Sequence, residues 1–212
     1  MNSHNEIIKQ ALNDYLQIDS PGYGVLIKGD WGCGKSFFIK QWKKSLEGGD
    51  VDNDEEYVNL KPIYVSLNGV TNTGKIDEAI KREISPILHG KFMKGVGKAM
   101  KFAASIALRF NVDAVGDASP EQMICTIDPK MLLECDPTKV RGKRILIFDD
   151  MERAMMPIEE TLGYINYFIE QVGCSVIIVG DDRNIGKQAD YKRIKEKTIG
   201  HEYRIETETE EA

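Results

Sequence analysis

The feature that most constrains the fold is a glycine-rich stretch, Gly29–Ser36, which lies between two apolar segments of different period. The run before it, at 24–27, is short and continuously apolar, as in a buried strand. After it, up to about Glu47, apolar residues recur at helical spacing and the pattern ends at two glycines. The segment is therefore predicted to form a strand, a tight loop and a helix in succession, as α/β domains do.

The glycine-rich stretch reads Gly-Asp-Trp-Gly-Cys-Gly-Lys-Ser and satisfies the pattern GxxxxGK[ST], whose loop turns backbone N–H groups toward phosphates. Lys35 is expected to contact the β and γ phosphates of a nucleoside triphosphate, and Ser36 to bind Mg²⁺ through its hydroxyl. The helix that follows points the positive end of its dipole at the same anion. A chance glycine-rich turn is the alternative, but the predicted strand and helix are the context that the motif requires.

The predicted ligands are ATP and Mg²⁺, although the loop does not identify the base. The expected nucleotide contacts are Gly29, Asp30, Trp31, Gly32, Cys33, Gly34, Lys35, Ser36 and Phe37.

Further apolar runs indicate the rest of a sheet. Strands are predicted at 62–67, 144–148 and 175–179, with a short fifth strand at 203–205. Helices are predicted at 5–17, about 76–88 and 158–172. Continuous apolar strands that alternate with amphipathic helices are typical of a parallel sheet covered on both faces. The predicted fold class is α/β, a three-layer sandwich with a mainly parallel five-stranded sheet.

The predicted organisation is a single domain at 23–206, preceded by a helix and lead-in at 1–22 and followed by an acidic tail at 207–212. The long interval between the loop and the later strands predicts an insertion at about 90–142. Within it, residues 91–110 place basic side chains on one side of a helix and apolar side chains on the other. Such a helix can contact an anionic membrane surface peripherally or dock on a partner. The alternative, which we favour, is a helix packed on the chain's own sheet with its lysines in water.

The apolar run 144–148 ends at two carboxylates, Asp149 and Asp150, at the strand end where open parallel sheets bind their ligands. This arrangement resembles a Walker B motif. Asp149 is predicted to hold the water shell of Mg²⁺, and Asp150 occupies the place of the carboxylate that polarises the attacking water. Asp150 is shorter than the glutamate that many ATPases have there, and Glu152 is a weaker substitute base. Two acids that merely cap a strand are the alternative.

Two further residues are candidate catalytic groups. Arg153 is placed to reach a γ-phosphate of its own or of a neighbouring subunit, as arginine fingers do. An ion pair with Glu152 or Glu160 is the slightly favoured alternative for Arg153. Asp181 follows the run 175–179 at the same edge, where it would sense the γ-phosphate or position water, or else form a simple Asx turn.

The composition narrows the classes of function. The chain is 42% hydrophobic and 29% charged, as in an ordinary soluble protein, and its net charge of −6 gives no sign of a nucleic-acid ligand. No stretch approaches the roughly 20 apolar residues that cross a bilayer. The four cysteines form no CxxC pair, and the start of the chain is polar rather than secretory. A cytoplasmic protein with reduced thiols is expected.

Four segments together resemble the KAP family of P-loop NTPases. They are GDWGCGKSFF, YVSLNG, ILIFDDMER and KEKTIG. Trp31 inside the loop and the spacing of Asp149, Asp150 and Arg153 are more specific than the bare loop pattern. The resemblance implies a bacterial protein with an AAA-like or STAND-like core in which ATP binding drives a conformational change, often at membranes or in phage defence. Unlike many members, this chain has no predicted membrane-spanning helix in the interval, and it stops where a helical lid usually follows, which suggests a truncated gene or a domain fragment.

The leading hypothesis is an Mg²⁺-dependent ATPase that acts on a protein partner or within a homo-oligomer. In it, Lys35 neutralises phosphate charge, Asp149 organises the metal and Asp150 prepares the water. The alternative is an ATP-binding assembly module with negligible hydrolysis. A small-molecule kinase ranks last, because no arginine-rich lid segment is present.

Overall fold

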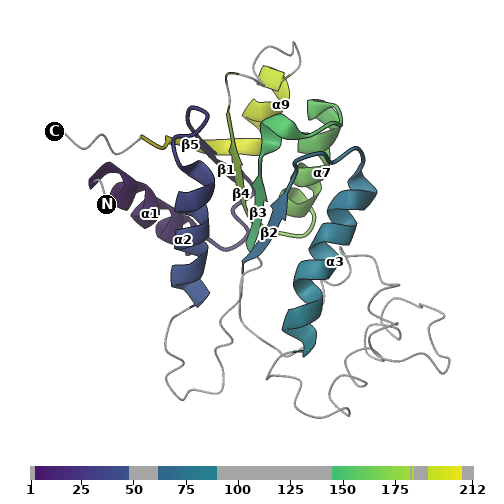
Figure 1. The fold of residues 1–212 in the computed structure, drawn as a ribbon, viewed down its shortest axis with the longest axis horizontal. Helices are drawn as coiled ribbons and strands as arrows, with labels where there is room; N and C mark the ends of the chain where they lie inside the picture. Colours follow the sequence, from purple (N-terminus) through teal and green to yellow (C-terminus); the bar gives the residue numbers. More distant parts are fainter. Residues whose placement is uncertain (1–2, 48–61, 90–144, 182, 184–190, 207–212) are drawn as a thin grey trace.

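The structure is a computed structural model that describes residues 3–47, 62–89, 145–181, 183 and 191–206. Within these ranges a central sheet is flanked by helices on both faces (Figure 1). The predicted insertion at about 90–142, with its basic stripe at 91–110, and the acidic tail lie outside the described residues. The domain boundaries therefore stay predictions.

All strands of the sheet run parallel. They are β1 (Gly24–Lys28), β2 (Ile63–Ser66), β3 (Ile145–Asp149), β4 (Ser175–Gly180) and β5 (Ile199–Arg204). Their order is β2-β3-β4-β1-β5, so β4 lies between the strand that enters the glycine-rich loop and the strand that carries the acidic pair. Because the strands are parallel, their carboxyl ends meet at one edge, which is where ligands bind in such sheets.

The helices form two layers. They are α1 (Ser3–Tyr15), α2 (Lys35–Glu47), α3 (Thr73–His89), α7 (Ile158–Glu170) and α9 (Tyr191–Thr198), with a 3₁₀ turn, η2 (Met151–Arg153). In Figure 1, α1 and α2 cover one face of the sheet, and α3 and α7 cover the other. No helix in the described part of the chain combines the length and hydrophobicity needed to cross a membrane.

Successive side chains of each strand point to opposite faces of the sheet, so the buried apolar residues form two hydrophobic cores, one on each face. In β1, Val25 and Ile27 pack toward α1 and α2, whereas Leu26 packs toward α7. Between the helices of the first layer, Trp42 is fully buried and its Nε1 donates to Asn13 Oδ1 at 2.9 Å, which joins α2 to α1. The side chains of β3 and β4 are buried on both faces, which explains their continuous apolar sequence.

The predicted fold class is confirmed, with one strand misplaced. The fifth strand was expected at 203–205, but β5 begins at Ile199, and α9, which runs directly into it, was not predicted. Both elements are poor in buried apolar side chains: β5 is an edge strand with mostly exposed residues, and the buried residues of α9 are Tyr191 and Thr198. Hydrophobic periodicity therefore carried no signal for them.

An ion-pair cluster on β5 makes stability depend on pH. Glu202 accepts from Lys28 Nζ at 2.5 Å and from Lys195 Nζ at 2.8 Å. Burial raises the pKa of this carboxyl, but the hydrogen bonds from Lys195 and Lys28 outweigh it and hold the pKa below its usual 4.5. Because the folded pKa is depressed, the stabilisation is present above the unfolded value and is lost as the pH falls through the folded value.

We therefore expect Glu202→Gln to reduce the loss of stability on acidification. Urea unfolding near neutral pH and below pH 4.5 measures the difference in the free energy of unfolding for both proteins. In the control, Glu160→Gln, the acid-induced loss should match that of the wild type. An equal loss in wild type and Glu202→Gln would contradict the assignment.

Candidate nucleotide site

The glycine-rich loop joins the end of β1 to the start of α2, as predicted. Gly34 has a φ of +92°, a left-handed conformation that glycine adopts without steric cost. At Gly29 the constraint is space, because an added Cβ would lie 2.6 Å from Cys33 Sγ and 3.0 Å from the carbonyl oxygen of Ile205. The loop is thus held close to the end of β5, and its shape requires glycine at both positions.

Lys35 is folded into this loop. Its Nζ donates to the carbonyl oxygens of Gly29 at 2.8 Å and Asp30 at 3.0 Å, and the residue is 8% exposed. Within the part of the chain that the structure describes, the hydrogen-bond acceptors of this ammonium group are two neutral carbonyls of the loop. A phosphate placed in the loop would offer Lys35 a charged acceptor, and charge-assisted hydrogen bonds are roughly twice as strong as neutral ones.

Asp30 is held from outside the loop by two arginines from neighbouring strand ends. Arg183 Nη2, beyond β4, lies 2.5 Å from Asp30 Oδ1, and Arg204 Nη1, at the end of β5, lies 3.0 Å from it. The hydrogen bond from Arg204 and the charge of Arg183 hold the pKa of the Asp30 carboxyl below its usual value. The loop is therefore tied to both strands that flank β1.

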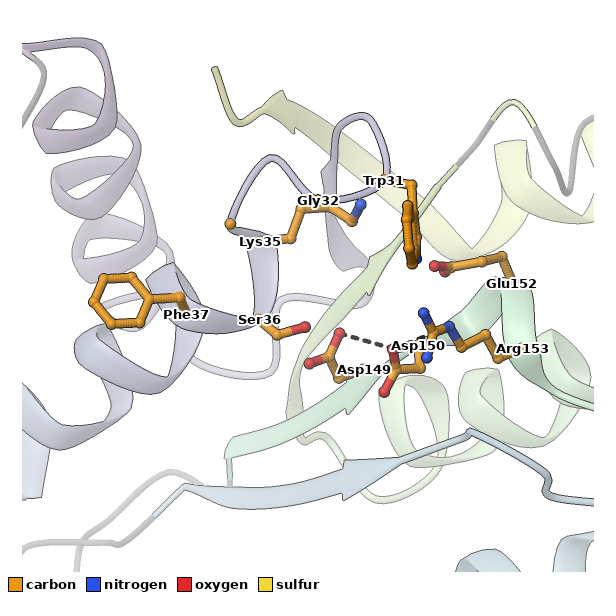
Figure 2. Close-up of a pocket in the computed structure, with 10 residues that line it drawn as sticks. Trp31, Gly32, Lys35, Ser36, Phe37, Asp149, Asp150, Glu152 and Arg153 are labelled. Carbon is orange, nitrogen blue, oxygen red and sulfur yellow. Dashed lines mark hydrogen bonds and ion pairs between the residues drawn. The ribbon is translucent and has the colours of Figure 1, made fainter. Parts of the chain in front are cut away.

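Facing the loop, Asp149 ends β3 with a carboxylate that is only 1% exposed. Its Oδ2 accepts a hydrogen bond from the hydroxyl of Tyr64, and its Oδ1 accepts from the backbone N–H of Asp150 at 2.8 Å. Burial, together with this hydrogen bond to Asp149, raises the pKa of the Tyr64 phenol, so Tyr64 remains a donor. In Figure 2 the hydroxyl of Ser36 faces the Asp149 carboxylate.

Asp150 adopts a strained backbone conformation, with a φ of 59° and a ψ of 39°. This left-handed region costs most residues about 1 kcal/mol or more, although Asp tolerates it better than most. Its side chain is oriented by Ser66 Oγ, which donates to Oδ2 at 2.9 Å, and by Arg153 Nε, which lies 3.8 Å from Oδ1. Asp150 is one of the residues that line the pocket.

Backbone hydrogen bonds stiffen this edge beyond the ends of β2 and β3. The N–H of Leu67 donates to the carbonyl of Asp149 at 2.8 Å, and the N–H of Gly69 donates to that of Arg153 at 3.1 Å. The N–H of Met155 donates to the carbonyl oxygen of Val70 at 2.8 Å. The acidic segment is therefore anchored to the segment after β2 and is not a free loop.

These elements enclose a pocket of about 220 Å³. It is lined by Trp31, Gly32, Gly34, Lys35, Ser36, Phe37, Asp149, Asp150, Glu152 and Arg153 (Figure 2). The loop and the acidic pair, which lie far apart in the sequence, thus line the same pocket. Phe37 and Trp31 are largely exposed, and Figure 2 shows the Phe37 ring directed away from the carboxylates.

Three of the sequence-based expectations look different in the structure. Asp181 is buried and does not line the pocket, and its Oδ1 accepts from the backbone N–H of Arg183 at 3.1 Å, which is the Asx turn that the sequence left open as the alternative. Glu152 lines the pocket, but its Oε2 accepts from the backbone N–H of Asp181 at 3.0 Å. Arg153 pairs with Asp150 and not with the expected Glu152 or Glu160. Glu152 is therefore occupied in tying the ends of β3 and β4 together.

Four residues of the site were not predicted. They are Tyr64, Ser66, Arg183 and Arg204. A signal existed for the first two, because Tyr64 and Ser66 alternate along a strand that ends at the ligand edge of the sheet. The arginines carried no comparable signal, since charged residues beyond strand ends are common on any surface.

The donor set fits a magnesium ion. Mg²⁺ at phosphate sites is bound by one or two protein oxygen ligands together with phosphates and water. Ser36 and Asp149 are oxygen donors that face each other across the pocket. Among the described residues there is no group of three or more His, Cys, Asp or Glu side chains that could hold a metal ion. The two residues could therefore hold the ion only in part, with phosphates completing its coordination.

The sequence matches the KAP family P-loop domain over residues 5–205. The chain belongs to the KAP family. The KAP domain has no match among curated protein sequences. Among solved structures, it is similar to Cdc6p from Pyrobaculum aerophilum, at 15% identity and a TM-score of 0.45, with 96% of this chain and 45% of that chain covered. It is also similar to Pif1 helicase from Candida albicans, at 13% identity and a TM-score of 0.41, with 97% and 39% covered. The KAP domain thus spans less than half the length of either chain.

Proposed function

We propose that this KAP domain binds ATP together with Mg²⁺, hydrolyses it and acts as a nucleotide-driven switch. The observation that carries the proposal is the meeting of Lys35, Ser36, Asp149 and Asp150 at one pocket, contributed by α2, by β3 and by the turn after β3. A triphosphate site needs a cation, a metal-binding hydroxyl and carboxylate, and a group to orient water. Each of these groups is present.

The chain's own residues have distinct roles in this mechanism. The loop N–H groups and the amino end of α2 would bind the phosphates, while Lys35 exchanges its two carbonyl acceptors for phosphate oxygens. Ser36 and Asp149 would hold Mg²⁺, which supplies charge neutralisation when bound. Asp150, oriented by Ser66 and Arg153, would accept a hydrogen bond from the attacking water and align it.

The contacts of Asp150 and Glu152 also favour the second candidate, an ATP-binding assembly module with negligible hydrolysis. Asp150 already accepts from Ser66 and pairs with Arg153, and Glu152 accepts from the backbone of Asp181. Each of these contacts occupies a carboxylate oxygen that would otherwise be available to accept a hydrogen bond from water. Binding of nucleotide and turnover are therefore separate questions.

The variant Asp150→Asn separates the two functions. If Asp150 aligns and polarises the water, phosphate release should fall by about 10²-fold or more, the lower range for general-base groups, while ATP affinity stays the same. Asparagine also tolerates the left-handed backbone, so the fold should be kept. Glu160→Gln, on the exposed surface of α7, is the matched control. Equal, near-zero rates in wild type and variant with ATP still bound would favour the assembly module.

A role in signalling to a partner completes the proposal. Arg153 is half-exposed at the rim of the pocket, where a neighbouring subunit or a protein partner could change its pairing with Asp150. We propose that nucleotide state is transmitted to such a partner in the cytoplasm. Family resemblance favours phage defence as the setting, and a peripheral membrane contact through 91–110 stays a prediction.

A further inference from the structure

Tyr64 is a residue of the site to which the proposed mechanism gives no role. It lies on the edge strand β2, beside β3, in register with Ile147. Its side chain is half-buried on the face covered by α2 and packs against the core of that face. Because side chains alternate along a strand, Tyr64 is on the same face as the Asp149 side chain on β3. Its hydroxyl reaches Asp149 directly.

The contact determines how the Asp149 carboxylate is turned. Oδ2 accepts from the Tyr64 hydroxyl, and Oδ1 accepts from the N–H of Asp150 at 2.8 Å. The torsion about the last bond of an aspartate is broad and roughly two-fold, so the carboxylate needs outside contacts to hold one orientation. One of those contacts is part of the backbone, and the other depends on a single side-chain hydroxyl.

The ring of Tyr64 makes a second contact, with the helix that carries the other metal-binding candidate. Lys40 Nζ lies 5.0 Å from the centroid of the ring. Lys40 is four residues after Ser36 on α2, so the two side chains share one face of that helix. Tyr64 therefore contacts Asp149 through its hydroxyl and α2 through its ring.

From this geometry we propose that Tyr64 is a positioning residue for Mg²⁺, which holds the Asp149 carboxylate in the orientation that binds the ion and its water shell. The inference rests on the proposed function. Outer contacts that orient a metal-binding group typically contribute 10- to 100-fold to metal affinity. Loss of the Tyr64 hydroxyl should weaken the binding of Mg²⁺ and leave the affinity of the loop for phosphate unchanged.

The test measures binding of a fluorescent, non-hydrolysable ATP analogue to the full chain, first in EDTA and then during titration with Mg²⁺. Tyr64→Phe keeps the ring and removes the hydroxyl. We expect unchanged analogue affinity in EDTA and a roughly tenfold or larger increase in the Mg²⁺ concentration at half-saturation. The matched control is Tyr164→Phe, which removes another tyrosine hydroxyl from a carboxylate, that of Asp77 on α3. Its Mg²⁺ half-saturation should equal that of the wild type.

Lys40→Gln tests whether the hydroxyl or the ring is responsible. This change removes the cation from the ring and leaves the hydroxyl in place, so its shift in Mg²⁺ half-saturation should be smaller than that of Tyr64→Phe. An equal or larger shift in Lys40→Gln overturns the role of the hydroxyl. So does an unchanged half-saturation in Tyr64→Phe, or an equal loss of analogue affinity with and without Mg²⁺.

The wild type separates failure of this inference from failure of the proposed function. If the wild type binds the analogue with a clear Mg²⁺ dependence and Tyr64→Phe shows the same dependence, the role of Tyr64 is overturned and the nucleotide site stands. If the wild type does not bind the analogue, or binds it with no response to Mg²⁺, the proposed metal site fails and the role of Tyr64 fails with it.

Discussion

Replacing Lys35 with alanine is expected to weaken ATP binding by about 100-fold, since a hydrogen bond to a charged group contributes about 1.5–3 kcal/mol and this ammonium would contact two phosphates. The residue is nearly buried, and its Nζ is bound to the carbonyls of Gly29 and Asp30. The amine is therefore placed in the loop before any anion arrives. Little of its binding energy is lost in ordering a flexible side chain.

Equilibrium titration with a fluorescent ATP analogue measures the effect of Lys35→Ala. The control is Lys44→Ala, which makes the same change of charge in the last turn of the same helix, away from the loop. Its affinity should stay close to that of the wild type. If both variants bind as tightly as the wild type, the loop is not a phosphate site, whatever its sequence. If both lose affinity equally, net charge rather than the loop governs binding.

The second large effect concerns stability. Phe148→Ala should lower the free energy of unfolding by about 3–5 kcal/mol, the usual range for removing a buried aromatic ring. Phe148 is 0% exposed, and its ring lies 6.2 Å from that of Phe168 on α7. The change would leave a cavity between β3 and α7, next to the acidic pair. Domains of this size have a net stability of only about 5–15 kcal/mol, so a large fraction of it would be lost.

Urea unfolding followed by circular dichroism measures this loss. Phe37→Ala makes the same chemical change at a side chain that is 67% exposed, and should alter stability by no more than about 0.5 kcal/mol. A loss below 1 kcal/mol in Phe148→Ala would mean that β3 and α7 are not packed as described. Equal slopes of the free energy of unfolding against urea in all three proteins would indicate that the substitutions change stability and not the compactness of the unfolded or native state.

Much of the fold could be predicted because the informative segments are local and buried. Strands β1, β3 and β4 are apolar on both faces, and so their sequences are continuous apolar runs. The amphipathic helices α1, α2 and α7 have one buried face, which produces the helical period. Element β5 and helix α9 bury too few apolar side chains to leave either pattern.

The candidate site was predicted in part, for a related reason. Contacts within a motif follow from spacing, as for Gly34, Lys35 and Ser36 in the loop, or Asp149 and Asp150 at a strand end. Contacts between motifs depend on which strands are neighbours. Tyr64 meets Asp149 only because β2 lies beside β3, and nothing in the order of elements along the chain specifies that pairing.

The sequence by itself determined the phosphate-binding loop, the acidic strand end and the α/β class, because each follows from residue types at short separations along the chain. Only the tertiary structure decided that β4 lies between the loop strand and the acidic strand, that Asp30 is held by arginines from β5 and from beyond β4, and that Asp181 does not line the pocket. These features depend on strand order and on side-chain packing, which are long-range properties. The motif within the loop therefore follows from the sequence, whereas the contacts that surround it follow from the packing of the sheet.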